Sequence, residues 1–237
     1  SGLMRVFLRH RKPELKEMMD DPNCDIEKLT NTFRQFKRIN KLLSKWNTIY
    51  KKEIRPVLKN QNGTGSLLDI GFGGGDISIQ LSELAAKDGF HLDITSIEAD
   101  RRAFEHIQTQ NTPSNIHFRH QLSSDLVKEK ASFDFVISNH LLHHLHKKDF
   151  IDICNEAEQL ASKKVIFNDI ERNDIAYVLF TIFSNIMFKN SFISYDGRIS
   201  IKRSYTLEEL SSVAPEYWTV SRLFPFRLIL IYDKEYI

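Results

Sequence analysis

Four glycines after a short apolar segment are the residues of this chain with the clearest chemical use. The stretch reads Leu67-Leu68-Asp69-Ile70-Gly71-Phe72-Gly73-Gly74-Gly75, and helical periodicity resumes directly after it. A turn without side chains lets a ligand approach both the backbone and the N-terminus of the following helix. Dinucleotide folds use a GxGxxG turn for a diphosphate. Here Asp69 stands two residues before the first glycine, which suits a zwitterionic ligand whose cationic group faces this acid.

A second acid, Glu98, ends the next predicted strand, at residues 92–97. A carboxylate at the tip of that strand can accept hydrogen bonds from both hydroxyls of a ribose. Asp100 is better placed to cap the helix that follows. The glycine turn and the ribose acid together predict a nucleoside-type ligand.

Histidines gather just after a later predicted strand, as His140, His143, His144 and His146. In a parallel α/β sheet this is the carboxyl edge, where ligands bind. An imidazole there can take a proton from an acidic acceptor group, and His140 and His144 are the candidate bases. We expect only one of the adjacent residues His143 and His144 to face the pocket. No acids stand beside these histidines in the sequence, so we predict no metal site.

Alternating strands and helices must position these groups. Apolar segments predict strands and a 3.6-residue period predicts helices, which together favour a doubly wound α/β sheet that ends in an edge pair. The predicted strands are 66–70, 92–97, 116–118, 133–138, 165–168, 218–223 and 228–232, and the predicted helices include 101–108 and 150–160.

Three further segments lie outside this alternation. Apolar residues every three or four positions predict one long helix over 33–50. The run 175–188 is apolar almost all round, which predicts either a buried helix or a lid over an apolar pocket. Thr206 and Glu209 have the capping-box spacing that opens a helix.

The composition narrows the class of protein. A chain of 237 residues that is 41% hydrophobic can form one sizeable core, and a net charge of +2 gives no general attraction to nucleic acid. Two distant cysteines fit a reducing compartment, and no apolar run is long enough to span a membrane. We therefore expect a cytoplasmic protein without a transmembrane segment.

The glycine motif and a second motif carry a resemblance to a known family. Residues 68–75 are similar to the first SAM motif of the class I S-adenosylmethionine (SAM)-dependent methyltransferases, and residues 133–145, FDFVISNHLLHHL, resemble the fourth in its ubiquinone- and menaquinone-methylase form. The resemblance implies a Rossmann-like, doubly wound, seven-stranded sheet with an antiparallel edge strand and extra N-terminal helices. Short strings at 11–15, 19–22, 168–170 and 196–200 also resemble a bacterial subfamily associated with phenolic or polyketide substrates.

The resemblance implies SAM as the cofactor and a set of residues that hold it. Asp69 would face the methionine ammonium and Glu98 the ribose. The family commonly holds adenine with an acid after the third strand, but this chain has Gln121, Leu122 and Ser123 there. Adenine contacts are therefore assigned to backbone atoms and to a side chain such as Gln121 or Ser123. The full predicted set is Asp69, Gly71, Phe72, Gly73, Gly75, Glu98, Ala99, Gln121, Leu122, Ser138 and Asn139.

These inferences predict a methyltransferase that acts on a small, apolar, aromatic or phenolic acceptor, with O-methylation favoured over C-methylation. We expect a helical cap over residues 1–60 and a catalytic domain over 61–237 with a helical lid at 174–205. Two alternatives stay open. An RNA or ribosome methyltransferase would use the basic face of the helix 33–50 together with Arg5, Arg9, Arg11 and Lys12. A non-catalytic module would bind SAM without turnover. A homodimer also stays open.

Overall fold

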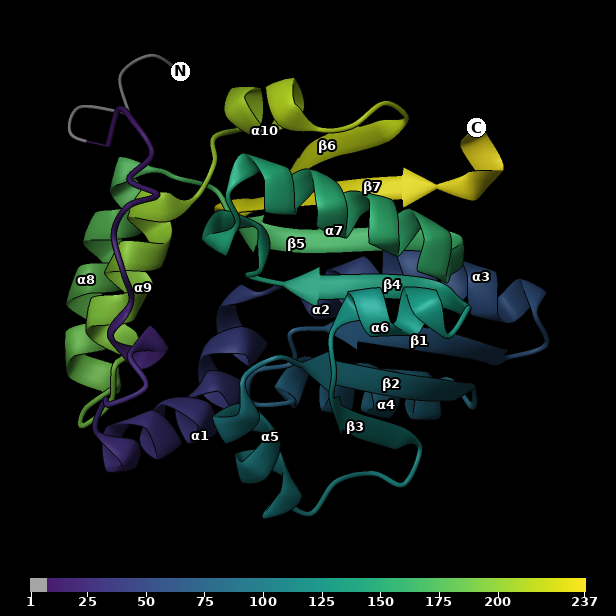
Figure 1. Cartoon of the computed structure of the whole chain (residues 1–237), viewed down its shortest axis with the longest axis horizontal. Coiled ribbons are helices and arrows are strands. Elements are labelled where there is room, and N and C mark those ends of the chain that lie inside the picture. Colours follow the sequence, from purple (N-terminus) through teal and green to yellow (C-terminus); the bar gives the residue numbers. More distant parts are fainter. Residues whose placement is uncertain (1–7) are drawn as a thin grey trace.

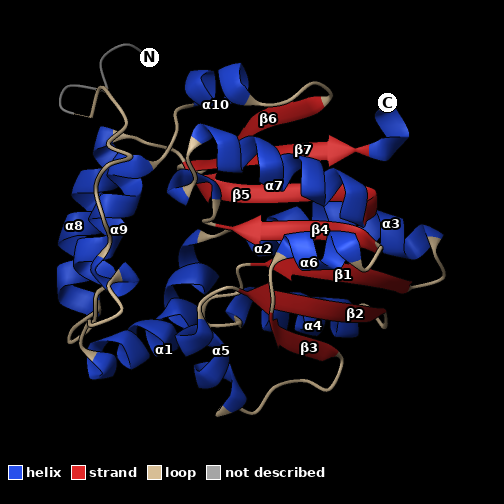
Figure 2. Cartoon of the chain, viewed as in Figure 1, coloured by secondary structure: helices blue, strands red, loops and turns tan. Residues whose placement is uncertain are grey.

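A mixed seven-stranded sheet forms the centre of the protein (Figures 1 and 2). The computed structural model describes residues 8–237. The strand order is β3-β2-β1-β4-β5-β7-β6, and β7 runs in the direction opposite to the other six strands. This confirms the predicted doubly wound, Rossmann-like sheet. The strands are β1 (Thr64–Ile70), β2 (His91–Glu98), β3 (Ile116–His120), β4 (Phe133–Asn139), β5 (Ala161–Ile170), β6 (Trp218–Leu223) and β7 (Arg227–Asp233).

Helices cover both faces of this sheet because successive strand residues point to opposite sides. In β5, Val165 and Phe167 join the core on one face of the sheet, while Ile166 joins the core on the other face. The helices are η1 (Met18–Asp20), α1 (Ile26–Leu43), α2 (Trp46–Ile49), the π-helix η2 (Tyr50–Ile54), α3 (Arg55–Asn60), α4 (Asp76–Lys87), α5 (Arg101–Gln108), α6 (Ser123–Lys128), η3 (Leu142–His144), α7 (Lys147–Leu160), α8 (Asp174–Met187), α9 (Ile193–Arg203), α10 (Leu207–Val213) and η4 (Lys234–Tyr236).

The single helix predicted over 33–50 is wrong, because the chain breaks after α1. Lys45 adopts a left-handed conformation with φ of 61°, and a new helix axis starts at Trp46. The break lets Trp46 bury its ring completely under the sheet and donate a hydrogen bond from Nε1 to Asn139 Oδ1 at 3.0 Å. The apolar spacing therefore continues across the break, but it serves two helices with different directions.

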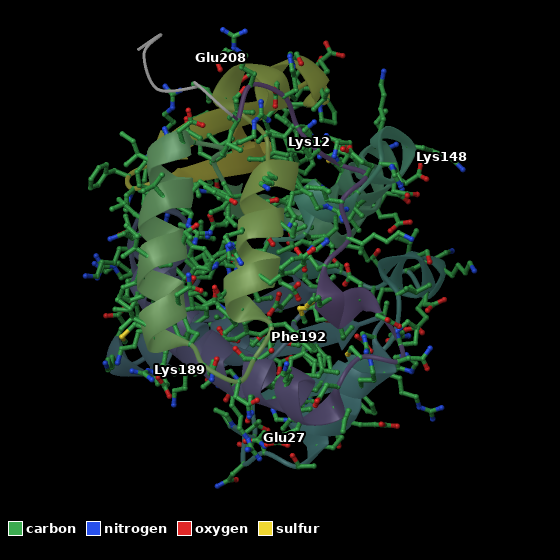
Figure 3. The ribbon with its side chains drawn as sticks, turned by 90° about the vertical axis from the view of Figure 1, so that its left-hand side faces the viewer. Lys12, Glu27, Lys148, Lys189, Phe192 and Glu208 are labelled. Atoms are coloured by element: carbon green, nitrogen blue, oxygen red, sulfur yellow. The ribbon has the colours of Figure 1, made fainter. Side chains whose placement is uncertain are left out.

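Two helices stand beyond the carboxyl edge of the sheet, on the left of Figure 1. Figure 3 looks onto this pair, α8 and α9, with Phe192 near their junction and the N-terminal segment around Lys12 running beside α9. The two helices pack closely at Gly197 of α9, where an added Cβ would lie 2.2 Å from the Phe180 ring of α8. They fall within the predicted lid at 174–205. The division at residues 60 and 61 stays a prediction.

Buried arginine side chains attach the N-terminal segment to the rest of the fold. Arg172 donates to the backbone oxygens of Leu8 and Arg9 and pairs with both carboxylate oxygens of Glu209. Glu209 also forms the predicted capping box of α10 with Thr206. These contacts hold Leu8 and Arg9 beside the end of β5, although more than 160 positions separate them from Arg172 in the sequence.

Candidate functional site

A large cavity of about 990 Å³ opens at the carboxyl ends of the parallel strands, between the sheet and helices α1, α8 and α9. Strand ends and the glycine turn contribute Asp69, Gly71, Phe72, Gly73, Glu98, Asn139 and His140. The helices contribute mostly apolar side chains, among them Phe33, Phe36, Ile39, Leu179, Phe180 and Phe183. The cavity therefore joins a polar end with backbone turns to an aromatic end.

The turn requires glycine at different positions for two different structural reasons. Gly71 and Gly73 have φ values of +76° and +55°, and an added Cβ would meet nothing closer than 3.9 and 3.8 Å. Gly75 has φ of +79°, and its added Cβ would lie 2.7 Å from Ile107. Gly71 and Gly73 thus leave open space at the cavity, whereas Gly75 is required by the packing of α4 against its neighbours.

Two carboxylates of the predicted set line this end of the cavity. Asp69 is 1% exposed and accepts a hydrogen bond from Ser78 Oγ at 2.7 Å. Burial raises the pKa of Asp69 to about 7 despite that hydrogen bond. Glu98 accepts backbone hydrogen bonds from Gly73 at 3.0 Å and Asp100 at 3.1 Å, and burial raises its pKa as well. Asp100 itself caps α5, as predicted.

Several predicted cofactor residues do not line the cavity. Gly75, Ala99 and Ser138 are not among its lining residues, and the Ser138 hydroxyl is buried without a hydrogen-bond partner among the described residues. The Gln121 side chain donates to Glu129 at 2.9 Å, and Leu122 is 53% exposed at the start of α6. The backbone N–H of Gln121 does reach Glu98 O at 3.2 Å, beside the end of β2.

His140, one of the two candidate bases, already has a hydrogen-bond partner at its imidazole ring. It follows β4 with φ of 61°, and its Nε2 is hydrogen bonded by Arg227 Nη1. Burial and the Arg227 charge hold the pKa of His140 well below its usual value. The imidazole is therefore neutral, and its lone pair is engaged by a buried guanidinium.

His143 and His144 both line the cavity, which contradicts the expectation that only one would face it. They lie on the 3-10 turn η3 with ring centroids 4.2 Å apart, so adjacent side chains stack on the same side. His143 Nδ1 is 2.7 Å from Asp169 Oδ1. Burial alone would lower the pKa of His143, but Asp169 and Glu17 together outweigh it and raise the pKa to about 9. Burial and the neighbouring His143 lower the pKa of His144 to about 4.

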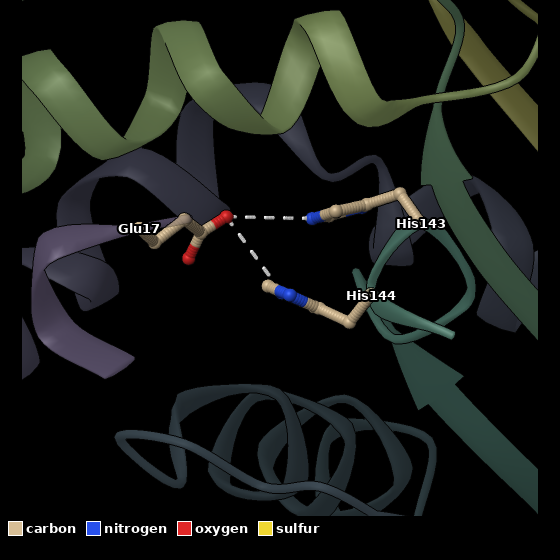
Figure 4. Close-up of side chains that lie close together, drawn as sticks. All are labelled: Glu17, His143 and His144. Carbon is tan, nitrogen blue, oxygen red and sulfur yellow. Dashed lines mark ion pairs between the residues drawn. The ribbon is translucent and has the colours of Figure 1, made fainter. Parts of the chain in front are cut away.

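Glu17 completes this cluster from the N-terminal segment (Figure 4). Its Oε1 lies 3.6 Å from His143 Nε2 and 3.8 Å from His144 Nε2, and it accepts a hydrogen bond from Ser200 Oγ. Burial would raise the pKa of Glu17, but the two histidines outweigh it and lower the pKa to about 2. We refer to Glu17, His143 and His144 as the Glu–His–His cluster.

Sequence reasoning missed Glu17, Asp169 and Arg203 as site residues. Asp169 and the region of Asp196 stand in strings that carried the subfamily resemblance, so a signal for them existed. Glu17 had none, because it lies 126 positions before His143 (143 − 17) and in no recognisable motif. Arg203 donates to Leu15 O and to the backbone oxygens of His143 and His144, which brings these distant segments together.

The site has the features that SAM requires. The open turn at Gly71 and Gly73 can admit a ligand to the backbone, and Glu98 presents a carboxylate at the end of β2. Asp69 offers a second carboxylate for a cationic group. The cavity also has room for an acceptor beside such a ligand, since ligand pockets commonly measure about 300–1,000 Å³.

Comparisons with known proteins agree with this geometry. Residues 67–164 match a protein family described as a methyltransferase domain. A comparison with curated proteins finds no match. Similar solved structures include the plantazolicin methyltransferase BpumL in complex with a pentazolic desmethylPZN analog and S-adenosylhomocysteine (SAH). The identity is 12% and the TM-score is 0.59, and the match covers 88% of this chain and 96% of that one. An O-methyltransferase family protein from Burkholderia thailandensis has 15% identity and a TM-score of 0.55, over 85% of this chain and 58% of its own.

At these identities the solved structures show the fold, and the domain match adds the activity class. No helix within residues 8–237 is long and apolar enough to cross a membrane. The matched domain begins at β1 and includes the glycine turn, Glu98 and the histidines. The chain is therefore a SAM-dependent methyltransferase with the class I fold, and SAM is its cofactor.

Proposed function

We propose that the protein transfers the methyl group of SAM to a hydroxyl oxygen of a small, apolar, aromatic acceptor, with carbon as the second choice of acceptor atom. One observation carries this proposal: a single cavity joins the glycine turn to an aromatic wall and to the Glu–His–His cluster. Such an arrangement can hold two small molecules side by side.

On the cofactor side, SAM supplies an electrophilic methyl group. Asp69 is assigned to the methionine ammonium and Glu98 to the ribose hydroxyls, while Gly71 and Gly73 give the cofactor access to the backbone. Transfer from a sulfonium needs little covalent help, so alignment and exclusion of water should supply most of the acceleration. The adenine contacts assigned to Gln121 and Leu122 require their side chains to turn from the surface toward the end of β2.

On the acceptor side, Leu179, Phe180 and Phe183 of α8 would pack against the apolar body of the acceptor. Its hydroxyl is assigned to the end of the cavity where the Glu–His–His cluster lies. His144 is favoured over His140 for removing the hydroxyl proton, because Arg227 already occupies the ring nitrogen of His140. A base at this position would contribute roughly 10²–10⁴-fold.

The geometry gives less support to an RNA acceptor. Arg34, Lys37, Arg38 and Lys41 lie on the exposed side of α1, and none of them lines the cavity. Arg5 lies outside the described residues. A basic surface that faces away from the transfer site gives no reason to direct RNA into it. A cytoplasmic location and a homodimer stay predictions.

The first test is calorimetric titration of the purified chain with SAM and SAH. Glu98→Gln should weaken SAM binding at least tenfold, because a neutral amide replaces the carboxylate assigned to the ribose. Asp93→Asn is the matched control, since Asp93 lies on the same strand but is exposed beside His117. Activity is then tested with a series of phenols as acceptors, and the amount of SAH released is measured. Binding that is unchanged in Glu98→Gln would contradict the cofactor assignment, and tight binding without turnover on any acceptor would favour a non-catalytic module.

A further inference from the structure

We propose that the Glu–His–His cluster binds a divalent transition-metal ion, with Zn²⁺ the best fit, and that the acceptor hydroxyl occupies the open coordination position. The inference rests on the proposed function and deepens it. It assigns the activation of the hydroxyl to a metal ion held by Glu17, His143 and His144. It also reverses the expectation of no metal site, which depended on the lack of an acid near the histidines in the sequence.

The spacing of the three side chains suits a metal ion. Zn²⁺ lies about 2.0–2.2 Å from histidine nitrogen and carboxylate oxygen in tetrahedral sites. Tetrahedral angles then place neighbouring ligand atoms roughly 3.3–3.6 Å apart. Glu17 Oε1 is 3.6 Å from His143 Nε2 and 3.8 Å from His144 Nε2, and all the ligand atoms lie within 4.8 Å of one another. Shifts of a few tenths of an ångström in these side chains would bring the ligand atoms to the spacing of a tetrahedral site.

The state of His143 is the independent observation that points to a ligand. Its side chain is 1% exposed, and its Nε2 has no hydrogen-bond partner among the described residues. Its Nδ1 is bound by Asp169, which also accepts from the His143 backbone N–H at 2.9 Å. Metal-binding histidines commonly donate the second ring nitrogen to a carboxylate, which directs the first toward the metal. Asp169 holds His143 in this way, with Nε2 directed at Glu17.

The surrounding hydrogen bonds hold the ligands in place before any metal arrives. Arg203 links the η3 turn to Leu15, two residues before Glu17. Asp196 accepts from the backbone of Met18 at 2.6 Å and Met19 at 3.0 Å, directly after Glu17. Both arms of the cluster are therefore fixed by α9. A site of this kind loses little conformational freedom when it binds an ion.

The ligand types select the class of metal. Imidazole nitrogen and carboxylate oxygen suit zinc and its neighbours, whereas Mg²⁺ prefers oxygen ligands alone. Three protein ligands leave a fourth position open, as in catalytic zinc sites. All three ligands line the cavity assigned to the acceptor, so an acceptor there could reach that position.

The ion would act as a Lewis acid without redox change. Coordination lowers the pKa of a hydroxyl, so the acceptor O–H bond breaks and its proton leaves to water. The oxygen then forms a bond to the methyl carbon while the carbon–sulfur bond of SAM breaks. The products are the methyl ether and SAH, and the metal keeps its charge. The role proposed above for His144 as a base then becomes that of a ligand.

Cobalt titration of the chelator-treated full chain tests the site directly, because Co²⁺ in a tetrahedral site with nitrogen and oxygen ligands absorbs visible light. We expect one Co²⁺ per chain, displaced by Zn²⁺. Asp169→Asn should weaken binding about 10–100-fold through the orientation of His143. His144→Asn, which removes a ligand at a partly exposed side chain, should weaken it at least as much. The exposed His117→Asn is the matched control, and circular dichroism checks that each variant is folded.

The outcomes separate the metal site from the proposed function. Absence of Co²⁺ binding by the folded chain, or equal binding by His144→Asn, would overturn the metal site. Methyl transfer at an unchanged rate after chelation would overturn its catalytic role and leave His144 as the base. If the chain binds Co²⁺ in this manner but no SAM, the metal site stands and the proposed function fails.

Discussion

Replacing Asp69 by asparagine should stabilise the protein at neutral and alkaline pH while it weakens SAM binding. Asp69 is buried at the end of β1, where only Ser78 Oγ donates to its side chain among the described residues. An ionised carboxylate at this position has lost most of its hydration, and none of the described residues forms an ion pair with it. Asparagine keeps the shape and an oxygen that can accept from Ser78, but it carries no charge.

The magnitude follows from the raised pKa. The folded protein shifts the pKa of Asp69 from 3.8 to about 7, which corresponds to roughly 4 kcal/mol between neutral and ionised forms. Because the folded-state pKa is raised, the stabilising contribution of the neutral carboxyl is complete below about pH 3.8 and is lost as the pH rises to about 7. The stability advantage of Asp69→Asn should therefore grow by roughly 2–3 kcal/mol between about pH 5 and about pH 8.

Urea unfolding followed by tryptophan fluorescence measures this effect, since Trp46 and Trp218 are both buried. The free energy of unfolding is compared between variant and parent at each pH, so that other titrating groups largely cancel. Asp93→Asn controls for the change in net charge. A difference that stays constant with pH, or that shrinks toward pH 8, would refute the burial argument. Excess SAM should stabilise the parent by RT ln(1 + [SAM]/Kd) and the variant by at least about 1.4 kcal/mol less, for a tenfold loss of affinity.

Four further substitutions test other parts of the structure. Gly197→Ala places a methyl group against the Phe180 ring and should lower the free energy of unfolding, measured with urea, by about 1–3 kcal/mol. The double variant with Phe180→Leu should recover part of this loss. Trp46→Phe removes the hydrogen bond to Asn139 and should cost about 1 kcal/mol beyond the loss of packing, by the same assay. Thr206→Ala should cost about 0.5–2 kcal/mol through loss of the α10 cap, read as a lower melting temperature. Phe183→Ala should raise KM for a phenolic acceptor severalfold and leave SAM affinity unchanged by calorimetry, because Phe183 belongs to the aromatic wall.

The sheet could be predicted from the sequence because its signals are local. Each predicted strand falls within an observed strand, and the capping residues Asp100 and Thr206 act where predicted. Buried parallel strands are short apolar runs, and a cap depends on residues only two or three positions away. The break at Lys45 could not be predicted in this way. The apolar spacing is the same on both sides of it, and the reason for the break is the burial of Trp46 against distant strands.

The sequence predicted which strand-end residues line the cavity, including His140 and His144, but not the contacts that surround the proposed acceptor. Asp69, the glycines and Glu98 lie at strand ends, where parallel topology alone brings them together. The acceptor half depends on contacts across the whole chain, as between Glu17 and His143 or between Asp169 and His143. The shared direction of His143 and His144 was also missed, because both rings approach Glu17, a residue far away in the sequence.

Residues inside and outside the matched methyltransferase domain should have different effects on the choice of acceptor. The matched methyltransferase domain, residues 67–164, supplies the glycine turn, Glu98 and the histidines. Glu17 and the helices α1, α8 and α9 that line the rest of the cavity lie outside it. Changes to the glycine turn or Glu98 should therefore alter SAM affinity for every acceptor alike, whereas changes in α8, α9 or the N-terminal segment should alter the choice of acceptor. Because Arg203 and Asp196 join α9 to both arms of the Glu–His–His cluster, packing between α8 and α9 should also affect activation of the acceptor.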